Sequence, residues 1–440
     1  MLKAGFARCD ITPPLGISIE GYYEKRNAKG VIDSLLATAV AFDDGEKKAV
    51  VISVDVIGMN MEFMSLLRPA VAKAADIDID GVFISCTHTH TGPAVAATGV
   101  TKETFPNPEY GNWLIRRIAD TAVMAFSDLV PAKLLYTRGE ADDVAHIRRF
   151  RMKDGSVRTN PGYMNPETDY ALGVPDEQSQ LLIIKREGKK EIGIINFQVH
   201  ADTIGGEKLS ADYPKFVREV YEKNVPDSLC MYINGTEGNL GGNNVFVERE
   251  DYVWGYERTK YMGKKIAMSV ISNYELAKEI PGDKIRFAKK VITVSHNKGN
   301  PEEVPAALEL ARRYREVGKE KTLQELGGEA KWEMLAKATT IAGMQQLPDT
   351  HDLIVTAVAI GDMVFAGFPG EPFCEVGMEV KKASPFTLTM PACCANGYEG
   401  YYPVQSAYDE GGYEVLTARY VAGTAEKLID TSLEIINSIK

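Results

Sequence analysis

Two histidines two residues apart are the sharpest chemical signal in this 440-residue sequence, which has six histidines in total. They are His88 and His90, in the segment CTHTHTGP. Imidazoles at positions i and i+2 of an extended segment project to one side and can address a common centre. The pair indicates a metal or catalytic site, although two histidines in a hydrogen-bonded loop would have the same sequence.

A third histidine and a glutamate also follow predicted strands. His200 comes after IINFQV and Glu371 after VFAGFPG, as His88 comes after VFISC. Ligands of α/β proteins bind outside the carboxyl ends of strands, where loops bring sequence-distant side chains together. Histidines and a glutamate at such ends form a plausible set of metal ligands. Taken singly, His200 is also read as a buried hydrogen-bonded histidine, and Glu371 as the acid at the N-terminus of a helix that begins near Pro372.

A loop rich in glycine and asparagine follows the predicted strand CMYI. It reads NGTEGNLGGNN, and its candidate substrate-facing residues are Asn234, Gly238, Asn239 and Gly241. Glycines let the backbone approach a substrate closely and expose N–H groups, but a surface turn has the same composition. The loop is no phosphate-binding P-loop, because the Gly-Lys-Ser/Thr ending is absent.

Strand-length apolar runs alternate with helix-period segments along the whole chain. Runs such as KAVVISVDVIG, VFISC and EIGIINFQVH are rich in Val and Ile. The alternation predicts an α/β fold with a large mixed β-sheet flanked by helices, and we expect residues 1–440 to form a single domain. Strand signals stop at Ser295 and resume at Asp352, so a helical insertion is expected at 298–346.

The composition excludes several function classes. Lys plus Arg number 50 and Asp plus Glu number 61, which gives a formal net charge of −11. Without basic blocks, this balance argues against nucleic acid or an anionic membrane as the main partner. No apolar run has the length of a signal peptide or a membrane span, so we expect a cytoplasmic protein without stable membrane association. The six cysteines show no CxxC spacing, which indicates reduced, buried thiols.

Several separated segments together resemble the neutral/alkaline ceramidases, a family of zinc-dependent amide hydrolases. In the family's order they are AGFARCDITPPLG with GYY at 21–23, ISCTHTHTGP, INFQVH, INGTEGNLGGN, FPGEPF and NGYEGYYPVQSAYDEGGYE. The tyrosine spacing of the last segment is the most specific feature, although five tyrosines taken alone would indicate only a packed or interface loop. The resemblance spans nearly the whole chain and implies the family's catalytic domain.

Carried over by position, the resemblance implies a Zn²⁺ ion bound by His88, His200, Glu371 and Tyr401. Imidazole and carboxylate ligands leave an open position on zinc, where water can lose a proton near neutral pH. Tyr401 is expected to be the weakest ligand, because a phenol binds well only where the cation favours its phenolate. The same ligand types also suit Mn²⁺, Fe²⁺ or Co²⁺.

The resemblance also implies catalytic groups beside the metal. His90 and Tyr413 match the family's catalytic histidine and tyrosine, and in HIRRFR we choose Arg148 over Arg149 as the active-site arginine. His90 would relay protons to the leaving amine, and Tyr413 with Arg148 would stabilise the oxyanion.

The sequence departs from the family pattern at several places. Gly241 and Gly242 stand where the family usually carries a serine followed by proline, so no side-chain nucleophile is present there and direct attack by metal-bound water is favoured. Ser406 and Ala407 precede Tyr408 where the family has two glutamates. We expect neither the family's export signal nor its C-terminal immunoglobulin-like domain. These differences leave the metal chemistry intact and put ceramide itself in doubt.

We therefore expect a cytoplasmic zinc hydrolase that cleaves an amide (N-acyl) bond in a small, soluble acyl substrate, with the question of a homo-oligomer left open. One alternative is an esterase or lactonase that uses the same zinc site. The other is a catalytically silent binding protein of the same fold, against which the retained His90 and Tyr413 argue.

Overall fold

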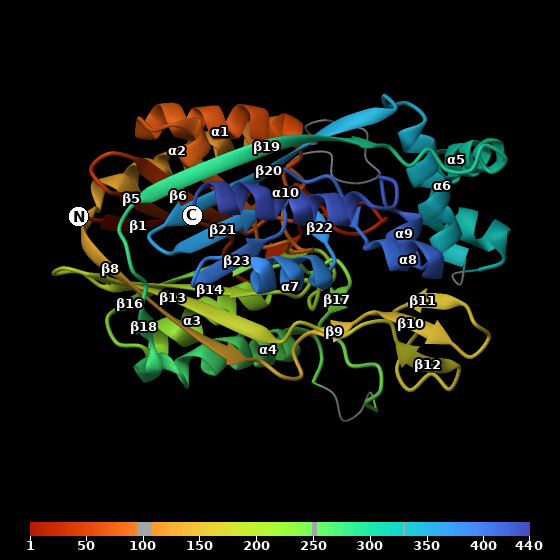
Figure 1. Ribbon diagram of the computed structural model, residues 1–440. Helices are drawn as coiled ribbons and strands as arrows, with labels where there is room; N and C mark the ends of the chain where they lie inside the picture. Colours follow the sequence, from red (N-terminus) through yellow and green to blue (C-terminus); the bar gives the residue numbers. More distant parts are fainter. Residues whose placement is uncertain (96–106, 249–252, 329–330) are drawn as a thin grey trace.

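Two β-sheets pack face to face between layers of helices (Figure 1). The computed structural model describes residues 1–95, 107–248, 253–328 and 331–440. Within these residues the larger sheet has nine strands, in the order β16 (Ser228–Asn234), β14 (Glu191–Phe197), β13 (Gln178–Arg186), β8 (Val130–Glu140), β1 (Lys3–Asp10), β5 (Leu36–Asp43), β6 (Lys48–Val54) and β7 (Val82–Cys86), with β18 (Lys278–Glu279) paired to β8. The smaller sheet has four, in the order β19 (Ile285–Ser295), β20 (Thr350–Ile360), β21 (Met363–Gly367) and β23 (Leu388–Ala392).

Period-two alternation divides the apolar residues of each strand between two cores. In β6, Val50 and Ile52 join the core under the outer helices, whereas Val51 joins the core between the two sheets. In β20, Val355 and Val358 divide in the same way between the outer and the inter-sheet cores. Strands covered on both faces lose their polar face, which explains the nearly continuous apolar runs in the sequence.

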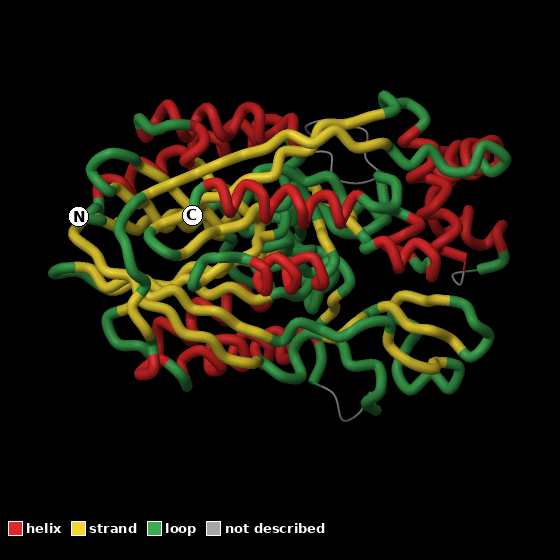
Figure 2. The backbone as a smooth tube through the Cα atoms, viewed as in Figure 1, coloured by secondary structure: helices red, strands yellow, loops and turns green. Residues whose placement is uncertain are grey.

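Helices cover the outer face of each sheet (Figure 2). Those on the nine-stranded sheet are α1 (Met61–Ala75), α2 (Pro108–Ser127), α3 (Tyr213–Asn224) and α4 (Gly255–Ile271). Those on the four-stranded sheet are α7 (Cys374–Ala383) and α10 (Thr424–Ser438). The predicted large mixed sheet flanked by helices is confirmed, and the second sheet inserted beneath α7 and α10 was not foreseen.

Smaller elements gather at the end opposite the two termini (Figure 1). They are α5 (Val304–Leu326), which bends at Gly318, α6 (Trp332–Met344), α8 (Gln405–Glu410), α9 (Tyr413–Leu416) and a three-stranded sheet of β11 (Val157–Thr159), β10 (Arg149–Met152) and β12 (Thr168–Ala171). Helices α5 and α6 lie between β19 and β20, in the stretch where a helical insertion was expected. Short ladders join β9 (His146–Ile147) to β17 (Leu240–Gly241) and β22 (Glu371–Pro372) to β24 (Tyr401–Tyr402).

None of the helices in the described ranges is long and apolar enough to cross a membrane. The cytoplasmic location stays a prediction.

A buried ion pair joins the end of β6 to helix α3. Both carboxylate oxygens of Asp55 accept hydrogen bonds from the Arg218 guanidinium, at 3.0 and 2.8 Å, and Asp55 also accepts from the Thr87 hydroxyl and from the Leu36 N–H. Asp55 is thus fully engaged by the protein, although it lies at a strand end like the candidate ligands.

Replacing Arg218 by methionine is expected to lower the free energy of unfolding by about 3 to 5 kcal/mol, because the carboxylate of Asp55 would be left buried and unpaired. Urea unfolding of the variant measures this loss. The matched control is Lys260→Met, which removes an exposed ion pair with Glu257 and should change the stability by less than about 1 kcal/mol. Equal effects of the two substitutions would contradict the prediction.

Candidate metal centre

Three side chains from separate loops meet in one buried cluster. His88 follows β7, His200 follows β14, and Glu371 opens β22. The Nε2 atoms of His88 and His200 lie 3.3 and 3.0 Å from Oε2 of Glu371, and each side chain is at most 2% exposed. A bridge between Thr89 and Ala201 lays the two histidine segments side by side. The structure therefore brings together three of the four predicted metal ligands.

Hydrogen bonds to the outer atoms orient these three side chains. Nδ1 of His88 donates to the Ile57 carbonyl at 2.8 Å, and Nδ1 of His200 donates to the carbonyls of Glu237 and Leu240 at 3.0 Å. With the proton on Nδ1, each Nε2 presents its lone pair to the centre, as in metal-bound histidines.

The carboxylate of Glu371 is oriented in the same manner. Its Oε1 accepts from the Tyr398 hydroxyl at 2.5 Å, while Oε2 faces the imidazoles. Among the described residues, neither Oε2 of Glu371 nor Nε2 of His200 has a partner of hydrogen-bond geometry. Nε2 of His200 and Oε2 of Glu371 thus lie 3.0 Å apart without a hydrogen bond between them. Two ligands of one shared cation would be placed in the same way.

The buried carboxylate of Glu371 needs a positive charge beside it. Burial would lower the pKa of His88, but the Glu371 carboxylate raises that pKa well above its ordinary value. Burial and then Arg148 lower the pKa of His200 to about 3, so its imidazole is neutral at physiological pH. Burial would raise the pKa of Glu371, yet the two histidines hold it well below the ordinary range. A proton on His88 or a divalent cation can provide the charge, and two imidazoles with one carboxylate fit Zn²⁺, Mn²⁺, Fe²⁺ or Co²⁺.

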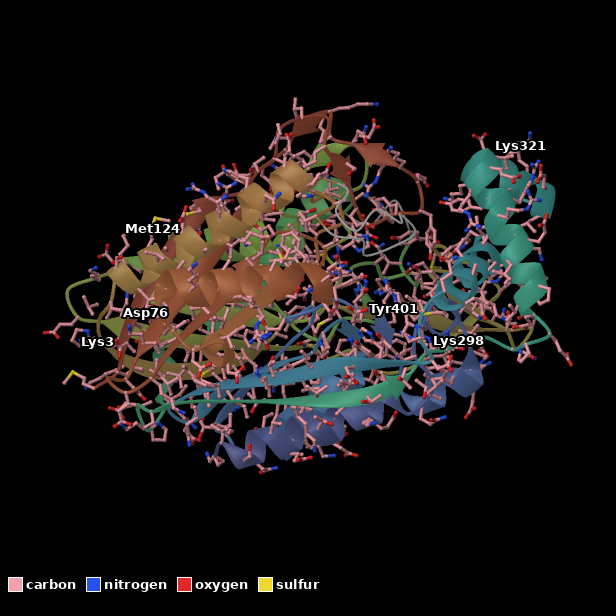
Figure 3. The ribbon with its side chains drawn as sticks, turned by 90° about the horizontal axis from the view of Figure 1, so that it is seen from above. Lys3, Asp76, Met124, Lys298, Lys321 and Tyr401 are labelled. Atoms are coloured by element: carbon pink, nitrogen blue, oxygen red, sulfur yellow. The ribbon has the colours of Figure 1, made fainter. Side chains whose placement is uncertain are left out.

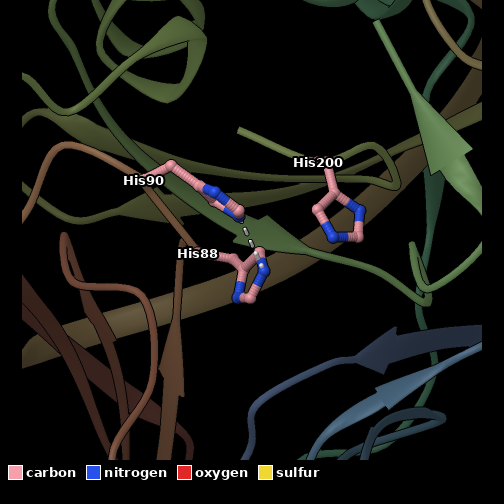
Figure 4. A group of neighbouring side chains, drawn as sticks. All are labelled: His88, His90 and His200. Carbon is pink, nitrogen blue, oxygen red and sulfur yellow. Dashed lines mark hydrogen bonds between the residues drawn. The ribbon is translucent and has the colours of Figure 1, made fainter. Parts of the chain in front are cut away.

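The second histidine of the pair also faces the centre (Figure 4). Nε2 of His90 lies 3.3 Å from Nε2 of His88, and burial, with the neighbouring His88, lowers the pKa of His90 well below its ordinary value. A Cβ on Gly21 would come within 2.9 Å of the His90 ring, so only glycine fits there. The segment is not extended as predicted, because His88 has a left-handed φ of 65°. The two rings therefore meet through a turn.

The predicted tyrosines and arginine form a layer beside His200. In the short β22–β24 ladder Tyr401 pairs with Glu371, and its ring stacks on that of His200 with centroids 6.3 Å apart. Arg148 donates to the Tyr401 hydroxyl at 3.0 Å and to the Glu414 carboxylate at 2.7 Å. Burial, followed by the Glu371 carboxylate, raises the pKa of Tyr401 well above its ordinary value, so the protein alone keeps it a neutral phenol. Its role as a metal ligand stays a prediction.

Tyr413 adjoins Tyr401 in this layer. Its ring meets Tyr401 edge-on at 5.8 Å, and its hydroxyl lies 3.4 Å from that of Tyr23. The neighbouring Arg149 instead binds the carbonyl of Gly411 and the carboxylate of Glu410. This geometry favours Arg148 over Arg149 as the arginine of the centre.

The glycine- and asparagine-rich loop lies under the cluster. Asn234 is fully buried and donates to the Thr87 carbonyl, while Asn239 accepts from the Cys374 N–H and donates to Glu375. These two side chains position strand and helix ends, so a direct contact with substrate stays a prediction for the loop.

The glycines of the loop lie closer to the predicted site residues. The carbonyl of Gly238 accepts from Arg148, and Gly241 packs against the Arg148 side chain. Sequence reasoning missed Glu237, Tyr398 and Glu414 as members of the site, although all three stand inside the segments that carry the family resemblance.

The fold and the buried cluster together define an α/β protein of two packed sheets with a candidate metal centre at the strand ends. No family model matches the chain. The solved structures that share its fold include a neutral ceramidase from Pseudomonas aeruginosa, with a TM-score of 0.74, and a ceramidase complexed with C2, with a TM-score of 0.73. Each is 16% identical in sequence, and the alignments cover 100% of this chain and 75% and 76% of those chains. The predicted resemblance to the neutral ceramidases is thus confirmed in the fold.

Proposed function

We propose that this protein is a zinc-dependent hydrolase that cleaves an amide bond in a small, water-soluble N-acyl substrate. The observation that carries the proposal is the convergence of His88 and His200 on Glu371, with their Nε2 atoms 3.3 and 3.0 Å from its Oε2, on a fold shared with ceramidases. When bound, zinc would supply Lewis acidity, which polarises a carbonyl and lowers the pKa of water to about 7.

The remaining residues of the centre supply proton transfer and charge stabilisation. His90 is held neutral, so its imidazole can accept a proton and pass it to the leaving amine. Arg148 is held in place by Glu414, and Tyr413 lies next to it in the same layer. Both can donate hydrogen bonds to the negative charge that develops on the carbonyl oxygen. Gly241 offers no side chain as a nucleophile, which favours attack by water.

The helical pair α5 and α6 connects to this centre through aromatic rings. Trp332 contacts Tyr413 with ring centroids 4.9 Å apart, and Tyr413 contacts Tyr401. The hydroxyl of Tyr314 on α5 donates to the carbonyl of Tyr23 at 2.8 Å. In Figure 3, Tyr401 lies between the main body and this pair, and Lys321 lies at the pair's outer end.

The outer surface of α5 is charged. Arg312 pairs with Glu309 and Glu316, and Arg313 pairs with Glu325, all of them on the surface. A substrate with long alkyl chains needs an exposed apolar collar at its entrance, whereas rings backed by charged residues suit a polar, soluble acyl compound. This argument favours a soluble substrate over ceramide, on which the similar proteins act by name.

The test combines elemental analysis of protein purified without chelator with a panel of N-acyl amines, lactones and long-chain ceramide in detergent micelles. We expect short soluble N-acyl amines to be hydrolysed with a kcat/KM of about 10⁴ M⁻¹s⁻¹ or more, the low end of the usual enzyme range, and ceramide much more slowly. Preference for long-chain ceramide over every soluble amide would contradict the proposed substrate class. Turnover of lactones alone would show that the protein cleaves ester bonds and would contradict the proposed amide hydrolysis.

A further inference from the structure

A second glutamate faces the candidate metal centre. Glu237 is 0% exposed, and among the described residues neither oxygen of its carboxylate accepts a hydrogen bond from a nitrogen or oxygen donor; the neighbouring donor is the Cys393 thiol. One of these oxygens lies with the facing atoms of His88, His200 and Glu371 in a group whose members are all within 4.8 Å of one another. A carboxylate without a nitrogen or oxygen donor is therefore aimed at the atoms that would hold the cation.

The loop after β16 fixes the position of Glu237. Its carbonyl accepts hydrogen bonds from Nδ1 of His200 and from the Leu240 N–H, at 3.0 and 2.8 Å. On the C-terminal side, a Cβ on Gly238 would come within 2.4 Å of the Glu371 carbonyl oxygen, so this residue must be glycine. The backbone that carries Glu237 is thus hydrogen-bonded to His200, and at Gly238 it packs closely against the backbone of Glu371 and donates to the Pro372 carbonyl.

Among the residues that the structure describes, no arginine or lysine side chain pairs with this second carboxylate. The guanidinium of Arg148, the charged group of the neighbouring layer, is bound to Glu414 and Tyr401. On its other side Glu237 meets the thiols of Cys393 and Cys394, which are fully buried and only weak hydrogen-bond donors. Burial of a carboxylate without a partner is strongly unfavourable, whereas coordination of a cation compensates it.

We infer that Glu237 is a further ligand of the cation held by His88, His200 and Glu371, an inference that rests on the proposed metal-dependent function. The site then offers two imidazoles and two carboxylates, and the two carboxylates neutralise a divalent cation. The added oxygen ligand raises the affinity for Mn²⁺ and Fe²⁺ beside Zn²⁺, because carboxylates suit these harder ions better than thiolates do.

Metal titration of Glu237→Gln tests the inference. Protein freed of metal by chelator is titrated with Zn²⁺ and with Mn²⁺ in competition with a fluorescent chelator. We expect the substitution to weaken Zn²⁺ binding by about 10- to 100-fold or more, because even residues that only support a ligand have effects of that size. The matched control is Glu191→Gln, a buried glutamate bonded to Tyr221 and Tyr274 away from the centre, which should bind both metals as the wild type does.

Thermal unfolding separates a ligand from a merely structural residue. Removal of a ligand should leave the Tm of the metal-free protein within a few degrees and reduce the increase that Zn²⁺ produces. A lower Tm without metal and an unchanged increase with metal would assign Glu237 a structural role and overturn the inference. Equal affinity of wild type and Glu237→Gln for Zn²⁺ would overturn it as well.

Cobalt substitution gives an independent readout of the ligands. A Co²⁺ spectrum that changes in Glu237→Gln and lacks a sulfur-to-cobalt charge-transfer band supports the two carboxylates and two imidazoles. Such a band would place Cys393 or Cys394 on the cation and overturn the assigned set. If the wild type binds no transition metal, the proposed function fails together with this inference, whereas normal metal binding by Glu237→Gln defeats the inference alone.

Discussion

Protein carrying His88→Ala or His200→Ala is expected to fold, to lose its bound metal and to lose hydrolysis. Each substitution removes one of two imidazoles that lie 3.0 to 3.3 Å from Oε2 of Glu371, and a small cation site does not tolerate the loss of a principal ligand. We expect about one zinc ion per wild-type chain and very little in either variant. Activity should fall at least about 10³-fold, because the cation supplies several kcal/mol of charge stabilisation at the carbonyl.

A histidine that lies outside the centre provides the control. His296 is also buried, but it packs on His351 and Tyr420 and its Nδ1 donates to the Pro348 carbonyl. His296→Ala should keep both the metal and the activity, apart from a loss of stability. If folded wild-type protein contains no transition metal, or if His88→Ala keeps a full equivalent, the metal-dependent function is wrong.

The fold could be predicted from the sequence as far as its signals are local. The apolar runs around β6 and β14 predicted strands, and the structure shows that neighbours such as Val50 and Val51, which point to opposite sides, are both buried. A local pattern does not show what covers each face. Val50 meets helices, whereas Val51 meets a second sheet built from residues more than two hundred positions later in the chain. The packing of the two sheets therefore had no signature in the sequence.

Part of the candidate site could also be predicted from local signals in the sequence. His88, His200 and Glu371 lie two to four residues after the ends of β7, β14 and β21, so the topology brings them to one edge. Glu237 was missed because a glutamate in a glycine- and asparagine-rich segment is normally exposed. Its burial depends on contacts with His200 and with the backbone of Glu371, far away in sequence. The positive φ of His88 was equally invisible, since a non-glycine residue seldom adopts it.

His90→Ala is expected to keep the metal and to lose about 10²- to 10⁴-fold in activity, the contribution of a positioned general acid or base. The nitrogen atoms of His88, His90 and His200 also lie within 4.8 Å of one another, but the group that contains the carboxylates Glu371 and Glu237 has only His88 and His200 as its imidazoles. The backbone of His90 is held separately, by Arg26 at its carbonyl and by Ala201 at its N–H. Removal of the ring should therefore leave the proposed ligands in place. Metal content and activity are measured on the same preparation.

The leaving group distinguishes a proton relay from other roles of this histidine. An amine must be protonated as it departs, whereas the phenolate of an activated aryl ester leaves without a proton. If His90 serves the leaving amine, His90→Ala should slow hydrolysis of an N-acyl amide far more than hydrolysis of an aryl ester with the same acyl group. Equal loss on both substrates would contradict the relay. Loss of metal in His90→Ala, to the same degree as in His88→Ala, would instead make the two histidines a pair of ligands, the alternative that their spacing in the sequence also allows.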